Sequence, residues 1–176
     1  MTPASLLSLL RDLRAATVQL LGEIEAYDFH HPLEPSGWTV LELVTHLTRD
    51  DEHYWFVTLV GGEPRAPWTV ATHSMWPTGH PGPVPVTKAD ACCEYLHAVA
   101  VSEAVLADRG LDEPTNWLDP TVPSRHQPRT IADVLALAVL EYSMHVGHLE
   151  AAAELFSQAG QSAEPSGARS SGRGEH

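Results

Sequence analysis

Apolar residues recur every three or four positions along four long stretches of the chain. This spacing places them on one face of an α-helix. In the first stretch the repeat includes Leu6, Leu10 and Leu13. Gly and Pro residues are concentrated between the stretches, where they end helices. The pattern predicts four helices, over residues 2–26, 40–60, 87–108 and 130–158.

The start of each predicted helix carries a capping signal. Thr2 precedes a proline, which suits the first helical position. Thr39 is followed three residues later by Glu42, which completes a capping box. Thr87 and Thr130 are each followed at the same distance by an aspartate. These local signals fix the helix starts more firmly than the helix ends.

Four long helices in a chain of 176 residues predict an all-α fold, a four-helix bundle. Two long connections rich in proline and tryptophan, 61–87 and 110–129, indicate a bundle that is not simply up-down-up-down. We expect their tryptophans either to anchor the loops on the core or to cover a binding site. Residues 161–176 offer little to bury, so we expect one domain over 1–160 and a disordered tail.

The charge balance excludes several classes of function. With 23 acidic and 10 basic residues the net charge is −13, which disfavours binding to nucleic acids or anionic membranes. No apolar run reaches the length of about 18 residues that spans a bilayer. The N-terminus also lacks a basic signal-peptide region, so we expect a cytoplasmic protein with a small-molecule substrate, either monomeric or a homodimer.

The adjacent Cys92 and Cys93 lack the two-residue spacing of a redox or zinc motif. We expect one of them to pack in the core and the other to lie at its edge.

The fourth predicted helix brings a carboxylate into an apolar stretch. Glu141 follows Leu137 and Leu140, and His145 lies four residues later on the same face. A buried carboxylate is normally paired or bound to a metal. On the second predicted helix, His46 lies within the apolar arc and also needs a partner. The three residues could hold a metal ion with open positions, or they could form a buried hydrogen-bond network.

The same second helix carries a polar stripe next to its apolar one. Steps of three and four residues place His46, Asp50 and His53 on one face. A polar stripe is usual for a helix that faces water on one side. We therefore expect Asp50, Asp51, Glu52 and His53 to be solvated rather than to bind a ligand.

The order of several short motifs resembles the DinB/YfiT-like metalloenzyme superfamily, DUF664 type. The motifs are Gly37-Trp38-Thr39-Val40 leading into His46-Leu47, Trp55-Phe56 before Gly61-Gly62, and the stretch from His145 to Glu150. The similarity covers about residues 5–158. The superfamily also includes the N-terminal domain of mycothiol-dependent maleylpyruvate isomerase. Unlike that isomerase, this chain has only a short tail after the predicted bundle, which argues against isomerase activity.

The resemblance implies a four-helix bundle that holds a divalent metal ion, such as Zn, Ni or Fe. Matched motif by motif, the ligands would be His46, Glu141 and His145, and His148 would lie beside them. Relatives with known activity imply a metal-dependent thiol S-transferase that uses mycothiol as co-substrate on a small electrophile. Asp50 and His148 would be the candidate catalytic residues, for proton transfer or ligand orientation.

Three other functions use the same residues. A metal-activated water would make the protein a hydrolase. Two histidines and one carboxylate could also bind Fe(II) for oxygen chemistry. The third alternative is a stress protein that binds a metal or a small molecule without catalysis.

Overall fold

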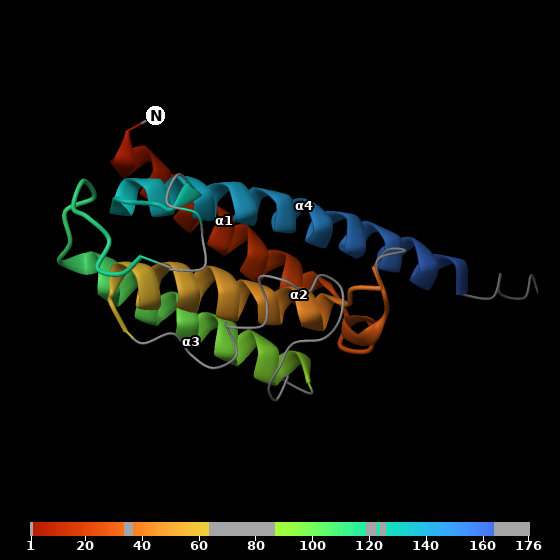
Figure 1. The fold of residues 1–176 in the computed structure, drawn as a ribbon. Helices are drawn as coiled ribbons and strands as arrows, with labels where there is room; N and C mark the ends of the chain where they lie inside the picture. Colours follow the sequence, from red (N-terminus) through yellow and green to blue (C-terminus); the bar gives the residue numbers. More distant parts are fainter. Residues whose placement is uncertain (1, 34–36, 64–86, 119–122, 124–125, 164–176) are drawn as a thin grey trace, which may run out of the picture.

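The fold is an all-helical bundle in which four long helical rods pack side by side (Figure 1). The structure is a computed structural model, and it describes residues 2–33, 37–63, 87–118, 123 and 126–163. The elements in chain order are α1 (Pro3–Glu23), the 3-10 helix η1 (Asp28–His30), α2 (Val40–His46), the π-helix η2 (Leu47–Val60), α3 (Lys88–Ala107) and α4 (Ile131–Ala163). No β-strand occurs among these residues, and the predicted all-α four-helix bundle is confirmed.

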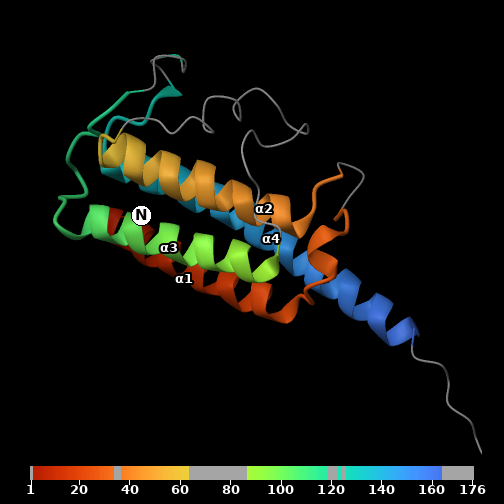
Figure 2. The same ribbon diagram turned by 90° about the horizontal axis from the view of Figure 1, so that it is seen from below.

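The rods lie at the corners of a square, as the two perpendicular views show (Figures 1 and 2). α1 packs beside α4 and α3, and the rod formed by α2 and η2 completes the square. Lys88 at the start of α3 donates to the carbonyl of Ile24, whereas Arg109 after α3 donates to the carbonyl of Val60. α3 is therefore antiparallel to α1 and parallel to η2, so the bundle is not simply up-down-up-down, as predicted.

The predicted helix starts are confirmed by their capping contacts. The Thr39 hydroxyl accepts a hydrogen bond from the Glu42 amide, and the Glu42 carboxylate accepts one from the Thr39 amide. Thr2 and Thr87 cap α1 and α3 in a similar way. At the start of α4 the Asp133 carboxylate accepts from the Thr130 amide. These local contacts set where each helix begins.

Two helix ends differ from prediction. α1 ends at Glu23 rather than near Ala26, and η1 follows. α4 continues to Ala163 instead of ending near Gln158, so part of the expected tail is helical. Gly160 is not among the described glycines with positive φ, and no left-handed cap ends the helix there. The remainder of the expected tail lies outside the described residues.

The second rod differs most from the sequence prediction. Its extent, from Val40 to a turn at Gly61, is as expected, but residues 47–60 form a π-helix. Asp50, Asp51 and Glu52 are 7%, 1% and 0% exposed, so the expectation that they are solvated is wrong. The i→i+5 bonding of a π-helix widens each turn and brings residues four and five apart onto nearly the same face. His53 is half-buried.

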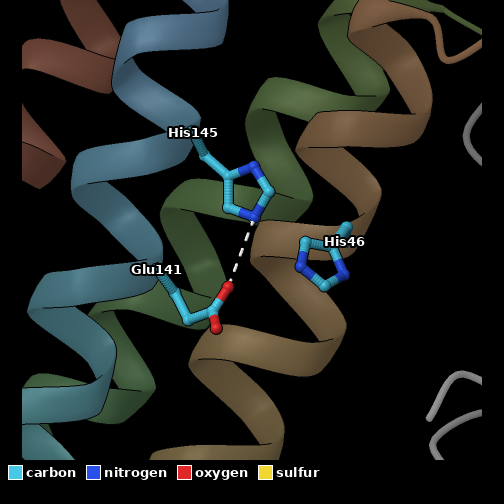
Figure 3. A group of neighbouring side chains, drawn as sticks. All are labelled: His46, Glu141 and His145. Atoms are coloured by element: carbon cyan, nitrogen blue, oxygen red, sulfur yellow. Dashed lines mark ion pairs between the residues drawn. The ribbon is translucent and has the colours of Figure 1, made fainter. Parts of the chain in front are cut away.

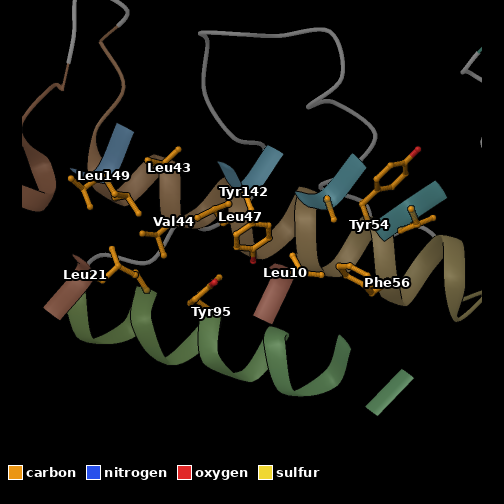
Figure 4. Close-up of a cluster of buried hydrophobic side chains, with 14 of the residues drawn as sticks. Leu10, Leu21, Leu43, Val44, Leu47, Tyr54, Phe56, Tyr95, Tyr142 and Leu149 are labelled. Carbon is orange, nitrogen blue, oxygen red and sulfur yellow. The ribbon is translucent and has the colours of Figure 1, made fainter. Parts of the chain in front are cut away.

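A buried ion pair crosses the apolar core. The labelled side chains in Figure 4 include Tyr142 from α4 and Phe56 from η2. Arg14 of α1 donates to both carboxylate oxygens of Glu52, at 2.8 and 2.6 Å, and its guanidinium lies 5.0 Å from the Phe56 ring centre. The Tyr142 hydroxyl donates to Glu52 as well. These contacts link α1, η2 and α4 at the centre of the bundle.

Of the tryptophans in the two long connections, the structure describes Trp117. Trp68 and Trp76 lie outside the described residues. Trp117 packs partly buried against the core, and its amide and that of Asn116 both donate to the carbonyl of Leu59 at the end of η2. Trp117 therefore anchors its loop on the core at that end of the bundle, which was the first of the two roles expected for the loop tryptophans.

Cys92 is half-buried against the core and Cys93 is exposed. Within the described ranges, no helix combines the length and hydropathy that a membrane span requires.

Candidate metal centre

The three residues singled out from the sequence meet between α2 and α4 (Figure 3). His46 is the last residue of α2, where the rod changes into η2. Glu141 and His145 project from one face of α4, one turn apart. One donor atom from each of the three lies within 4.8 Å of the other two. The predicted cluster is therefore present, with donors from two neighbouring helices.

The donor atoms of the cluster lie close to the spacing that a shared ion requires. His145 Nε2 lies 3.7 Å from Glu141 Oε2, beyond normal hydrogen-bond length. The imidazole rings of His46 and His145 meet edge to face, with centroids 4.9 Å apart. Two donors that bind one ion at about 2.1 Å stand roughly 3 to 4 Å apart. His145 and Glu141 have this spacing, and the donor atoms of all three residues lie within 4.8 Å of one another.

His145 provides the clearest test of fit for a cation. It is 3% exposed, and neither ring nitrogen has a hydrogen-bond partner among the described residues. Such buried polar atoms are rare and call for an explanation. Burial lowers the pKa of His145, despite the opposing effect of Glu141. A neutral imidazole with an unused nitrogen is the form that binds metals, so these residues fit the ion that the sequence resemblance implies.

Asp50 orients His46. One oxygen of the Asp50 carboxylate lies 2.9 Å from His46 Nδ1. The pKa of His46 is raised overall. Burial acts to lower it, but the hydrogen bond to Asp50 and the charges of nearby carboxylates outweigh the effect of burial. The Trp38 ring also contacts the imidazole edge to face. With Nδ1 engaged by Asp50, Nε2 is the nitrogen available to an ion, which is the usual arrangement of a ligating histidine.

Asp51 lies beside the cluster, although its position in the sequence did not indicate this. Its Oδ2 lies 4.0 Å from His46 Nε2, and its Oδ1 accepts a hydrogen bond from Trp55 Nε1 at 3.1 Å. Burial raises the pKa of Asp51 to about 7. In an α-helix, with about 100° per residue, Asp51 would point about 140° away from His46. Only the five-residue spacing from His46 could have indicated it, and that spacing becomes meaningful only in a π-helix.

His148 lies at the edge of the cluster. Its side chain is exposed, and its ring centroid is 5.7 Å from that of His145. It does not belong to the group of three donors found among the described residues. His145, rather than His148, is the histidine that approaches His46 and Glu141. The proposed roles of Asp50 and His148 in proton transfer stay predictions.

The contact between Tyr142 and Glu52 connects the two sides of the site. Tyr142 follows Glu141 on α4, and Glu52 follows Asp51 on η2. Their hydrogen bond joins α4 to η2, and the Arg14–Glu52 pair holds the same carboxylate from α1. This contact was not expected from the sequence, in which the charged run from Asp50 to His53 resembles a solvated face.

Comparison with known protein families identifies the family to which the chain belongs. A family model described as mycothiol-S-transferase matches residues 5–158, which include the complete α2, η2 and α3 and most of α1 and α4. No curated protein and no solved structure matches the chain significantly. The match confirms the expected placement among DinB/YfiT-like proteins. The chain belongs to the mycothiol-S-transferase family.

Proposed function

We propose that this protein is a metal-dependent S-transferase that joins mycothiol to a small electrophilic substrate. The observation that carries the proposal is the cluster of His46, Glu141 and His145, in which three donor atoms converge and both nitrogens of buried His145 lack a hydrogen-bond partner among the described residues. Family membership supports the choice of thiol and of reaction class.

The three side chains would act together as an ion-binding set. His46 offers Nε2 because Asp50 engages Nδ1, and His145 is kept neutral by burial. Glu141 supplies one negative charge. Two imidazoles and one carboxylate suit Zn, Ni or Fe and leave positions open for a further ligand. When bound there, such an ion would lower the pKa of a thiol and so increase the fraction of reactive thiolate.

The remaining chemistry is a simple substitution. The thiol sulfur donates an electron pair to an electrophilic carbon, the bond to the leaving group breaks with its electron pair, and the thiol proton passes to a base. His148, exposed beside His145, is our candidate for that base. Asp50 is a positioning residue in this proposal, since its carboxylate contacts His46.

The test is a conjugation assay with mycothiol and 1-chloro-2,4-dinitrobenzene as the electrophilic probe. Chelator-treated protein is compared with protein reloaded separately with Zn²⁺, Ni²⁺ and Fe²⁺. We expect conjugate and chloride to form faster than in the uncatalysed reaction only with the reloaded protein. His145→Ala should lower the rate by a factor of at least about 100. His97 is an exposed residue of α3, so His97→Ala should keep the wild-type rate.

The outcomes separate the proposal from its alternatives. Equal rates with and without metal, or no rate above the uncatalysed reaction, contradict the S-transferase. Oxygen uptake by the Fe²⁺ protein without thiol consumption would indicate an oxygenase. Cleavage of an ester probe without thiol would indicate a hydrolase. One bound equivalent of metal with no reaction in any assay would favour a binding protein.

A further inference from the structure

One carboxylate beside the candidate metal centre has no role in the arrangement described so far. Asp51 is 1% exposed, and its Oδ2 has no hydrogen-bond partner among the described residues. That oxygen faces His46 Nε2 at 4.0 Å, the nitrogen that Asp50 leaves available. The other oxygen is fixed by Trp55 Nε1. The unpartnered oxygen therefore lies beside the nitrogen that His46 would offer to an ion.

The fold keeps Asp51 there at a cost. Burying a carboxylate oxygen without a hydrogen-bond partner is unfavourable, and Asp51 Oδ2 has no such partner among the described residues. The π-helix that turns Asp51 inward is itself a rare conformation that occurs often at functional sites. A carboxylate that is buried next to a candidate cation site, although its burial is unfavourable, indicates a role that depends on its charge.

The charges around the proposed site would balance with Asp51 included. A divalent ion, Glu141 and Asp51 sum to zero, and His46 and His145 are neutral when they bind an ion. Asp50 has a cationic neighbour in Arg49, and Glu52 is paired with Arg14. A thiol that enters with its proton leaves this balance unchanged, even as its sulfur gains thiolate character at the ion, because that proton stays in the hydrogen bond to Asp51. A bare anion would add an uncompensated negative charge within a buried site.

We propose that Asp51 makes this site selective for an entering ligand that carries its own proton, such as a thiol, over a bare anion. The inference rests on the proposed function, because it requires an ion at His46, Glu141 and His145. It goes further by assigning ligand selection to a residue outside that set. The Asp51 carboxylate would accept the hydrogen bond of a protic ligand and repel an anion of similar size.

The experiment uses Co²⁺-loaded full-length protein, because the visible spectrum of Co²⁺ reports the ligands around it. 2-Mercaptoethanol serves as the thiol probe and azide as the anion probe, each titrated at one neutral pH. The measured quantity is the ratio of their half-saturating concentrations in the wild type, Asp51→Asn and Asp51→Leu. The leucine variant separates loss of charge from the new hydrogen-bond donor that asparagine would bring.

In both Asp51 variants we expect azide to bind about tenfold more tightly relative to the thiol than in the wild type. Asp28→Asn is the matched control, since Asp28 is a carboxylate buried in η1 that is paired with His31. This control should keep the wild-type ratio. Circular dichroism of each variant confirms that the bundle is folded.

Three results would overturn the inference. The first is a ratio that stays within about twofold of the wild type in both variants. The second is a folded Asp51 variant that binds no Co²⁺, which would make Asp51 a ligand itself. The third is a wild-type protein that binds azide but not the thiol. Failure of the wild type to bind Co²⁺ would instead remove the metal centre, and with it both this inference and the proposed function.

Discussion

His46 Nδ1 lies 2.9 Å from a carboxylate oxygen of Asp50, across the junction where α2 becomes η2. This contact fixes the ring orientation and leaves Nε2 facing the cluster. Groups that orient a ligating histidine typically contribute 10- to 100-fold to metal affinity. We therefore predict that Asp50→Ala weakens Zn²⁺ binding by about that factor, measured by competition with a chromophoric chelator.

Two further variants make the Asp50 result specific. Asp50→Asn keeps an acceptor oxygen for His46 and should recover part of the lost affinity. Asp12→Asn removes an exposed carboxylate of α1 and should leave affinity unchanged. If Asp50→Ala binds Zn²⁺ as tightly as the wild type, Asp50 does not position His46.

The buried Arg14–Glu52 pair should matter strongly for stability. Arg14 is 4% exposed and Glu52 is fully buried, so removal of one partner leaves an uncompensated charge in the core. Such a loss typically costs 3 to 5 kcal/mol. We predict that Arg14→Met lowers the free energy of unfolding by about this amount, measured by denaturant titration.

The double variant Arg14→Met/Glu52→Gln removes both charges but keeps an acceptor for Tyr142, and it should recover most of the loss. Arg11→Ala is the comparison, because the Arg11 side chain is 55% exposed in its pair with Glu103. It should cost no more than about 1 kcal/mol. If Arg14→Met costs as little as Arg11→Ala, the buried pair has no special role.

The Asp51 carboxyl should make the metal-free protein less stable at higher pH. Burial raises its pKa in the folded state to about 7, whereas the unfolded value is about 3.9. Between these values the folded state retains a proton that the unfolded state releases. Stability from this group is therefore present below pH 4 or so and is lost as the pH rises toward about 7.

Asp51→Asn removes this dependence. We predict that the metal-free variant is more stable than the wild type above about pH 7, by on the order of 2 to 4 kcal/mol, and similar to it near pH 4. Thermal unfolding across that range tests the difference. Added Zn²⁺ should reduce the difference, because a nearby cation favours the ionised carboxylate. A constant difference at all pH values would contradict this account.

The sequence was sufficient where structure depends on neighbouring residues. The capping box of Thr39 and Glu42 acts over three residues, and it is present as predicted. The spacing of Glu141 and His145 likewise follows from one helical turn. His46 could be added because its apolar surroundings indicated a core-facing side chain. The fold class and the three-residue cluster were therefore accessible from local patterns.

The sequence was insufficient where tertiary contacts change the helix itself. An α-helical period places Asp51 and Glu52 away from His46, and the charged run from Asp50 to His53 resembles a solvated face. In the structure Glu52 is held by Arg14 and Tyr142, from two other helices. Those partners lie 38 and 90 residues away in the sequence. The periodicity of one helix does not report contacts with other helices. The buried position of Asp51 could therefore not be predicted from it.

The central claim is that His46, Glu141 and His145 together hold one divalent ion. The most direct measurement is a calorimetric titration of Zn²⁺ into chelator-treated wild-type protein and into His145→Ala, with His97→Ala as the control. We predict one equivalent bound by the wild type and by the control, and binding at least about 100-fold weaker in His145→Ala. No binding to the wild type, or equal binding to all three proteins, would contradict the claim.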